Sequence, residues 1–241
     1  MKKCNARWYD KFYIKKKEPT LSPWNKKIFE VIRKITHSSK NVRLLDIGCG
    51  TGGLLLSLAR NRVIAPENLY GIDWSEIAIN KIRLKKRIPP NNLNVGDVEK
   101  DGLRKFVSEY FDIIVMAEVI EHLKNPDRVL GEVYRILKPN RYLIISFPNY
   151  LNVPWLFLRL LAEKLNKPQW IVLQPVDHIF TSFQVKKMIE CKGFKLIKIH
   201  GEVYFPPILY KYESECFSRF LDKCNLSMFA FHPVMTFVKT F

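Results

Sequence analysis

The chain has 241 residues, of which 47% are hydrophobic and 13% aromatic, so it can bury a sizeable core and lacks the composition of a disordered protein. Its five scattered cysteines include no Cys-x-x-Cys pair, which argues against a disulfide framework or thiolate zinc site and favours a cytoplasmic protein. The formal charge of +17 is compatible with a phosphate- or lipid-binding surface, but no RNA-binding signature or aromatic ladder accompanies the basic clusters, so we favour a lysine-rich ordinary enzyme.

Apolar runs and helical periodicity alternate along the chain. Residues 25–35 carry apolar side chains at helical spacing, and residues 42–47 form a short apolar run that ends in glycines. Further helices are predicted at 54–59, 75–86 and 126–137, and further strands at 68–72, 93–95, 111–116, 142–147, 194–200 and 234–239. Strands separated by helices of this length predict βαβ units. We therefore expect an α/β, Rossmann-like fold with a mostly parallel sheet of about seven strands and helices on both faces.

No internal repeat or low-complexity linker divides the chain, so we predict one domain over residues 1–241. Its core would be 42–148, and residues 177–241 would complete the sheet. Residues 150–175 interrupt the alternation and look like an insertion. Its apolar run at 153–161 is far shorter than the roughly 20 residues of a membrane span, so no transmembrane segment is predicted. A substrate lid, a peripheral membrane helix and a dimer contact are all compatible with this run, and we favour the lid.

Glycines cluster where the first predicted strand meets its helix. Gly48, Gly50 and Gly52 alternate, as suits a sharp turn that lets a ligand approach the backbone. Together with Gly53 they also satisfy Gly-x-Gly-x-x-Gly, so an NAD-dependent oxidoreductase has to be considered. Asp46 stands two residues before the first glycine, where an acid can orient the loop and help to hold a cationic amino-acid group. A pyrophosphate would not favour that acid, so the pattern points away from a dinucleotide.

These residues resemble the first motif of the class I S-adenosylmethionine-dependent methyltransferases, hydrophobic-Asp-x-Gly-x-Gly-x-Gly. Four later segments, 69–73, 95–98, 111–118 and 136–139, resemble the remaining motifs of that family in order. Asn140 stands where the family often has a glycine, and asparagine also tolerates the left-handed conformation. The resemblance implies S-adenosylmethionine as cofactor, with Asp73 on the ribose hydroxyls, Asp97 on the adenine amino group and Ala117 on the methionine moiety. The implied cofactor-binding set is Asp46, Gly48, Gly50, Gly52, Asp73, Asp97, Val98 and Ala117.

Three residues directly after the fourth strand, Glu118, Glu121 and His122, are the candidate catalytic groups. The run Glu-x-x-Glu-His resembles a sequence in ubiquinone-pathway O-methyltransferases and in small-RNA 3′-end 2′-O-methyltransferases, where metal is used. His178 is similar to a later histidine of the latter group, so Glu118, Glu121, His122 and His178 form a candidate site for a divalent metal. Many relatives without metal carry Glu-His-Leu at this place, and His122 could act as a general base without metal.

The function we expect is S-adenosylmethionine-dependent O-methylation of a small or lipid-like acceptor. Metal-assisted 2′-O-methylation of RNA is one alternative, and a non-catalytic cofactor-binding protein is another, beside the oxidoreductase. The aromatic segment from Trp8 to Tyr13 could fold over the cofactor or serve only in packing. The other histidines, among them His232, lack partners in the sequence and are interpreted as structural or exposed.

Overall fold

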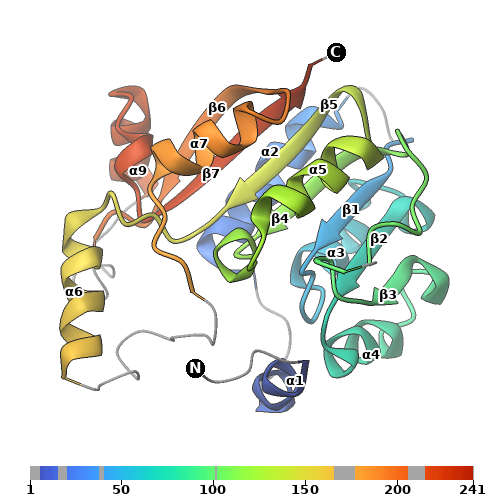
Figure 1. The fold of residues 1–241 in the computed structure, drawn as a ribbon. Coiled ribbons are helices and arrows are strands. Elements are labelled where there is room, and N and C mark those ends of the chain that lie inside the picture. Colours follow the sequence, from blue (N-terminus) through green and yellow to red (C-terminus); the bar gives the residue numbers. More distant parts are fainter. Residues whose placement is uncertain are drawn as a thin grey trace.

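The structure is a computed structural model that describes residues 6–15, 21–37, 41–100, 102–165, 177–205 and 215–240. Its centre is a seven-stranded sheet in the order β3-β2-β1-β4-β5-β7-β6 (Figure 1). The strands are β1 (Leu44–Ile47), β2 (Leu69–Asp73), β3 (Leu93–Val95), β4 (Phe111–Ala117), β5 (Leu137–Ser146), β6 (Phe194–Glu202) and β7 (His232–Lys239). Strands β1 to β5 run parallel, whereas β7 is antiparallel to both of its neighbours. The predicted mostly parallel, Rossmann-like sheet is confirmed.

Helices cover both faces of this sheet, as predicted (Figure 1). They are α1 (Ala6–Lys15), α2 (Pro23–Ile35), α3 (Gly53–Arg60), α4 (Glu76–Leu84), α5 (Pro126–Ile136), α6 (Val153–Lys164), α7 (Ser182–Glu190) and α9 (Glu215–Lys223). Side chains of β4 alternate between two cores: Ile113 and Val115 pack with α2, α3 and α4, and Ile114 and Met116 pack with α5 and α7. Burial on both faces explains why the strand reads as one continuous apolar run.

Element boundaries differ from the predicted ones where tertiary pairing decides them. Strand β5 begins at Leu137 instead of residue 142, because Leu137 already pairs with Phe111 of β4 before the register shifts. Asn140 has a φ of +56°, so it does adopt the predicted left-handed conformation. The helix α7 was not predicted, although Thr181 and Gln184 form a reciprocal capping box at its start.

The predicted insertion at 150–175 contains α6, and its residues 166–176 lie outside the described part of the chain. Asn152 caps α6 by accepting the N–H of Trp155. Arg159 ties α6 to the returning chain, because its guanidinium donates to Tyr150 Oη over 2.7 Å and to Asp177 Oδ2 over 3.0 Å. Among the described helices, none has the length and apolar character that crossing a bilayer requires.

Candidate functional site

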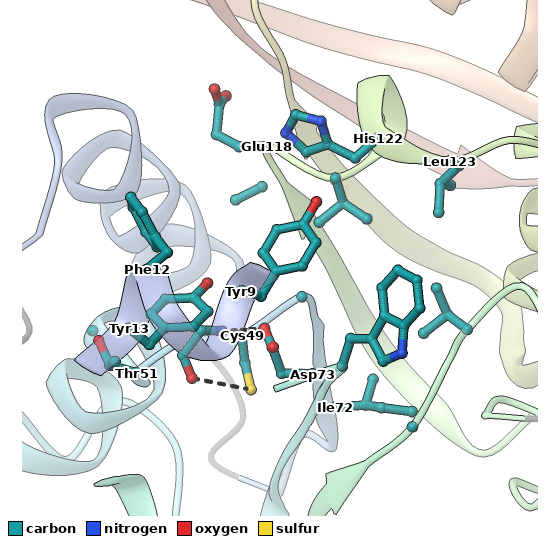
Figure 2. Close-up of a pocket in the computed structure, with 18 of the residues that line it drawn as sticks. Tyr9, Phe12, Tyr13, Cys49, Thr51, Ile72, Asp73, Glu118, His122 and Leu123 are labelled. Carbon is teal, nitrogen blue, oxygen red and sulfur yellow. Dashed lines mark hydrogen bonds between the residues drawn. The ribbon is translucent and has the colours of Figure 1, made fainter. Parts of the chain in front are cut away.

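A cavity of about 500 Å³ opens at the carboxyl ends of β1, β2 and β4 (Figure 2). This is where ligands bind in open parallel sheets, because the loops after neighbouring strands meet there. Its walls come from the loop 48–53, the end of β2, residues 96–99, residues 117–123, and the helices α1 and α2. Segments that are distant in sequence therefore meet around one space of ligand size.

The glycine loop after β1 forms the floor of the cavity. Gly48, Gly50 and Gly52 have φ values of +70°, +52° and +79°, a region that side chains rarely adopt, which accounts for the alternating glycines. The N–H of Gly50 donates to Asp73 Oδ2 over 2.8 Å. A Cβ atom on Gly50 would lie 2.9 Å from Tyr13 Oη, so the close packing of Tyr13 on the loop depends on glycine at this position.

Of the eight predicted cofactor residues, Gly48, Gly50, Asp73, Asp97, Val98 and Ala117 line the cavity. Asp46 and Gly52 do not reach its surface. Asp46 is buried behind the loop, where burial and then the charge of Asp73 raise its pKa to about 8. A Cβ on Gly52 would meet Ile82 of α4 at 2.8 Å, so this glycine allows two helices to approach closely.

Carboxylates dominate the polar part of the wall. Asp73 accepts the N–H of Ser75 on Oδ1 over 2.8 Å, and burial raises its pKa although these backbone hydrogen bonds oppose the rise. The lining acids are Asp73, Asp97, Glu99 and Glu118. No lysine or arginine is found among the described residues of this wall, although the chain carries a formal charge of +17. The cavity is thus an acidic site within a basic protein.

Helix α1 covers the cavity with aromatic side chains, so the N-terminal aromatic segment does lie over the site. Tyr9, Phe12 and Tyr13 of α1 all line the cavity. Tyr13 lies beside the glycine loop, and Tyr9 extends towards His122 (Figure 2). Lys81 of α4 donates to the carbonyl of Tyr13 over 2.7 Å, which fastens α1 at this position. Burial, followed by the charge of Asp73, raises the pKa of the Tyr13 hydroxyl well above its usual range.

The predicted catalytic run lies at the opposite side of the cavity, after β4. Glu118 and His122 line it (Figure 2). Glu121 is not among the lining residues and is 1% exposed. His122 Nε2 lies 3.5 Å from Glu121 Oε1, and neither oxygen of Glu121 finds a hydrogen-bond partner within the described structure. Burial, and then the charge of Glu118, raise the pKa of Glu121 well above its usual range.

The predicted metal site has no support among the described side chains. Within the described ranges, no three or more His, Cys, Asp or Glu side chains are grouped so that they could hold a metal ion. The imidazole of His178 does not line the cavity, since its Nε2 lies 3.0 Å from the carbonyl oxygen of Leu123. The carboxylate of Glu118 turns instead to Ser146 Oγ, which donates to Oε1 over 3.2 Å. The four predicted ligands therefore do not share a centre.

Two residues near this wall were missed in the sequence. His232, at the start of β7, places Nδ1 at 3.2 Å from Glu118 Oε1, and its ring stacks on Trp24 of α2 with centroids 4.0 Å apart. Trp24 itself lines the cavity. Glu118 and His232 are 114 positions apart, so no local motif links them, and only the antiparallel placement of β7 beside β5 brings them together.

Comparisons with known proteins also indicate a methyltransferase. A protein-family model described as a methyltransferase domain matches residues 14–199. The chain is 27% identical over 154 residues to a demethylmenaquinone methyltransferase of Leptospira interrogans, a match that covers 59% of this chain and 60% of that protein. It is 28% identical over 178 residues to a ubiquinone biosynthesis O-methyltransferase of Coxiella burnetii, covering 72% of this chain and 71% of that one.

Solved structures share the fold at lower identity. A SAM-dependent methyltransferase from Archaeoglobus fulgidus superposes with a TM-score of 0.60 at 20% identity, covering 89% of this chain and 94% of that chain. A [4+2]-cyclase, SpnF, superposes with a TM-score of 0.58 at 18% identity, covering 89% and 80%. The same architecture thus supports different reactions, so the cavity, and not the fold, identifies the class of acceptor.

Proposed function

The chain belongs to the methyltransferase-domain family, within the class I S-adenosylmethionine-dependent enzymes, and from this premise we propose that it methylates an oxygen of a small, quinol-like acceptor. The observation that carries the proposal is the acidic, aromatic cavity above the glycine loop. Such a cavity favours a cationic cofactor at one end and a flat, uncharged acceptor at the other.

The residues of the cavity fit S-adenosylmethionine. Gly50 lines the cavity and, having no side chain, lets other atoms approach its backbone closely, and the carboxylate of Asp73 at the end of β2 is suited to ribose hydroxyls. Asp97 and Val98, from the loop after β3, would contact the adenine, and Ala117 the methionine moiety. When bound, the cofactor supplies an electrophilic methyl group on a sulfonium. A dinucleotide fits less well, because its pyrophosphate would meet carboxylates without a basic partner among the described lining residues.

The acceptor would lie between the cofactor end and the wall formed by Glu118, His122 and Trp24. We assign removal of the hydroxyl proton to His122, because its imidazole lines the cavity and imidazole exchanges protons near neutral pH. Glu121 lies behind the ring and restricts its orientation through the 3.5 Å approach to Nε2. Glu118 would accept a hydrogen bond from the acceptor. Positioning of the nucleophile would supply much of the remaining rate enhancement.

A quinol-like acceptor is supported by two independent features. Relatives over much of the chain are named for demethylmenaquinone and ubiquinone methylation, and the wall offers aromatic rings on which a flat ring can stack. An RNA acceptor is disfavoured, since its phosphates would face carboxylates at the described wall of the cavity. No step in this proposal requires a metal ion.

The proposal is tested by methyl transfer from radiolabelled S-adenosylmethionine to quinol and catechol compounds, with lipid extract and RNA as parallel acceptors. We expect labelled product from the quinols and catechols and none from RNA. A matched reaction with His122→Asn shows whether the signal depends on the cavity. Label in RNA alone, or cofactor binding with no transfer to any ring hydroxyl, would contradict the proposed acceptor class.

A further inference from the structure

Glu118 occupies a strained position at the wall of the cavity. Its φ is +57°, a left-handed conformation that residues other than glycine adopt with strain, and its N–H donates to Ser146 O over 2.9 Å. Strain of this kind clusters at functional sites, where the surrounding structure holds it in place. The strained backbone here directs a carboxylate towards the cavity lined by Trp24 and His122.

Two side chains hold that carboxylate, and both do so through the same oxygen. Ser146 Oγ donates to Oε1, and His232 Nδ1 lies 3.2 Å from it. Contacts on one oxygen fix the plane of the carboxylate without occupying Oε2. The carboxylate of Glu118 is therefore held in a fixed orientation, and its Oε2 can accept a hydrogen bond from a ligand.

His232 is itself held rigidly by an aromatic stack. Its ring is 7% exposed, lies 4.0 Å from Trp24 at an interplanar angle of 19°, and meets Phe231 edge to face at 4.6 Å. Phe231 stacks in turn on Trp155 of α6, with centroids 3.9 Å apart at 4°. Four rings thus run from the cavity wall to α6, so the position of Glu118 is tied to two helices and a strand.

The charges around the cavity are unequally placed. Asp73, Asp97 and Glu99 follow β2 and β3, at the end assigned to the cofactor, where a cationic ligand can balance them. Glu118 is the lining acid at the end of β4, beside Trp24 and His122. No lysine or arginine is found among the described lining residues, so an anionic group placed at this wall would meet the carboxylate of Glu118, which His232 contacts only at Oε1.

We propose that Glu118, His232 and Trp24 form an acceptor-recognition wall that admits flat rings bearing a hydrogen-bond donor and rejects rings bearing negative charge. The inference rests on the proposed function, because it concerns the acceptor end of the same cavity. Trp24 provides the stacking face, Glu118 receives the donor, and His232 is a positioning residue that acts through Glu118. Rejection arises from repulsion by the carboxylate of Glu118, whose contacts with Ser146 and His232 are both made through Oε1, and such repulsion is a specificity device in its own right.

The test measures binding of three catechols to the full chain loaded with S-adenosylhomocysteine, by titration calorimetry at pH 7. The probes are 4-methylcatechol, which is neutral, dopamine, which is cationic, and 3,4-dihydroxybenzoate, which is anionic. We expect the anionic probe to bind about tenfold or more weakly than the neutral one. Equal binding of the three probes, tighter binding of the anionic one, or no binding of any would overturn the proposal without any variant.

Variants assign the effect to the wall. Glu118→Gln keeps the shape and removes the charge, and should bring the three affinities within about threefold of one another. His232→Phe keeps a ring against Trp24 but loses the Nδ1 contact with Glu118. This variant should reduce the differences in affinity among the three probes and leave the affinity for S-adenosylhomocysteine unchanged. The matched controls are Glu190→Gln, which loses an exposed pair with Lys186, and His200→Phe, which loses the contact of His200 with Asp222. A ranking that survives Glu118→Gln, or that changes equally in the controls, overturns the proposal.

Methyl transfer to the same probes is scored separately. If affinity depends on the charge of the probe but no methyl group is transferred, the proposed O-methylation is contradicted and the proposed acceptor-recognition wall is still supported. Transfer to all three probes at equal kcat/KM supports O-methylation and overturns the charge selection. The two proposals can therefore fail independently.

Discussion

The carboxylate of Asp73, at the end of β2, accepts the backbone N–H of Gly50 over 2.8 Å and so joins two motifs that lie 23 positions apart. The other oxygen of Asp73 accepts the N–H of Ser75, the N-cap of α4. The acid assigned to the ribose is therefore also a support of the glycine loop. A substitution at Gly50 or at Asp73 should therefore weaken cofactor binding in two ways, by disturbing the glycine loop and by disturbing the contact with the ribose.

Cofactor affinity should fall in Gly50→Ala and in Asp73→Ala. The added Cβ at Gly50 would force a left-handed alanine towards Tyr13 Oη, and loss of Asp73 removes hydrogen bonds to the loop and the ribose. We expect a loss of about 1–3 kcal/mol of binding free energy for Asp73→Ala, measured by calorimetric titration with S-adenosylmethionine. Gly131→Ala is the matched control, because a Cβ there meets nothing within 4 Å. Undiminished affinity in both site variants would contradict this placement of the cofactor.

Asp46→Asn should make the free energy of unfolding less dependent on pH. Burial, and then the charge of Asp73, raise the pKa of Asp46 from 3.8 to about 8 in the folded protein. Between these values the folded state holds a proton that the unfolded state has released, so stability decreases as the pH rises, by up to about 1.4 kcal/mol per pH unit. Asparagine cannot titrate, so the variant should lose less stability than the original chain between pH 5 and pH 8. Chemical denaturation at pH 5 and pH 8 measures the free energy of unfolding of both proteins. An equal loss of stability between the two pH values in the variant and the original chain would refute the prediction.

Local sequence and the family resemblance were sufficient to predict which segments line the proposed cofactor end of the cavity. The glycines at 48, 50 and 52 are required by backbone conformation at those positions, and a run of buried strand residues followed by glycine marks the turn directly. The resemblance assigned Asp73 and Asp97, and their positions agree with it, because Asp73 ends β2, Asp97 follows β3, and such strand ends meet at one edge of the sheet. The mostly parallel sheet was predicted from the same alternation, whereas the order of its strands was not.

The acceptor end could not be predicted in this way. The resemblance suggested that Glu118, Glu121 and His122 act together, but Glu118 lines the cavity with a left-handed backbone, whereas Glu121, in the 3-10 turn Ile120–His122, is buried. His232 reaches Glu118 only through the antiparallel strand β7, a contact without local signature. The insertion helix α6 was located from its apolar run, whereas its tie through Arg159 depends on tertiary structure.

His122→Asn should reduce kcat by about 10²- to 10⁴-fold, the usual contribution of a positioned acid or base, with S-adenosylmethionine affinity unchanged. A chelator should leave turnover unchanged, because the described side chains offer no group of metal ligands. His178→Asn is the discriminating control, since the ring of His178 lies beside the carbonyl of Leu123 and does not line the cavity. Steady-state kinetics with and without chelator are measured for the unaltered chain, His122→Asn and His178→Asn. Joint loss of activity on chelation and in His178→Asn would restore the metal hypothesis.

Arg159→Met should destabilise the fold by about 3–5 kcal/mol, because it leaves a buried carboxylate without its partner. The Arg159 side chain is 6% exposed and that of Asp177 is 10% exposed, and they are joined over 3.0 Å. Lys186→Met breaks an ion pair of similar length with Glu190 on the surface of α7, where the loss should stay below about 1 kcal/mol. Midpoints of urea unfolding compare the two. Equal losses would show that α6 is not fastened by this pair.

The exposed apolar face of α6 is predicted to act on the acceptor and not on the cofactor. Phe157 and Leu160 are 66% and 50% exposed, and no residue of α6 belongs to the described lining of the cavity. Deleting the helix would also remove Arg159, so the sharper variant is the double substitution Phe157→Ser and Leu160→Ser, which alters only the exposed face. If α6 closes over the acceptor, the acceptor KM should rise about tenfold, with S-adenosylmethionine affinity and unfolding free energy nearly unchanged.

Leu84→Ser is the matched control for that double variant, because Leu84 on α4 is 77% exposed and lies on a different part of the surface. Its kinetics should equal those of the unaltered chain, since an isolated exposed leucine contributes little to folding or binding. Sedimentation with phosphatidylglycerol vesicles is run on all three proteins. An unchanged KM together with loss of vesicle binding in the α6 variant alone would replace the lid with a membrane-surface helix, since only the second role requires the apolar face to meet lipid. An unchanged KM with unchanged sedimentation would reject both roles for this face.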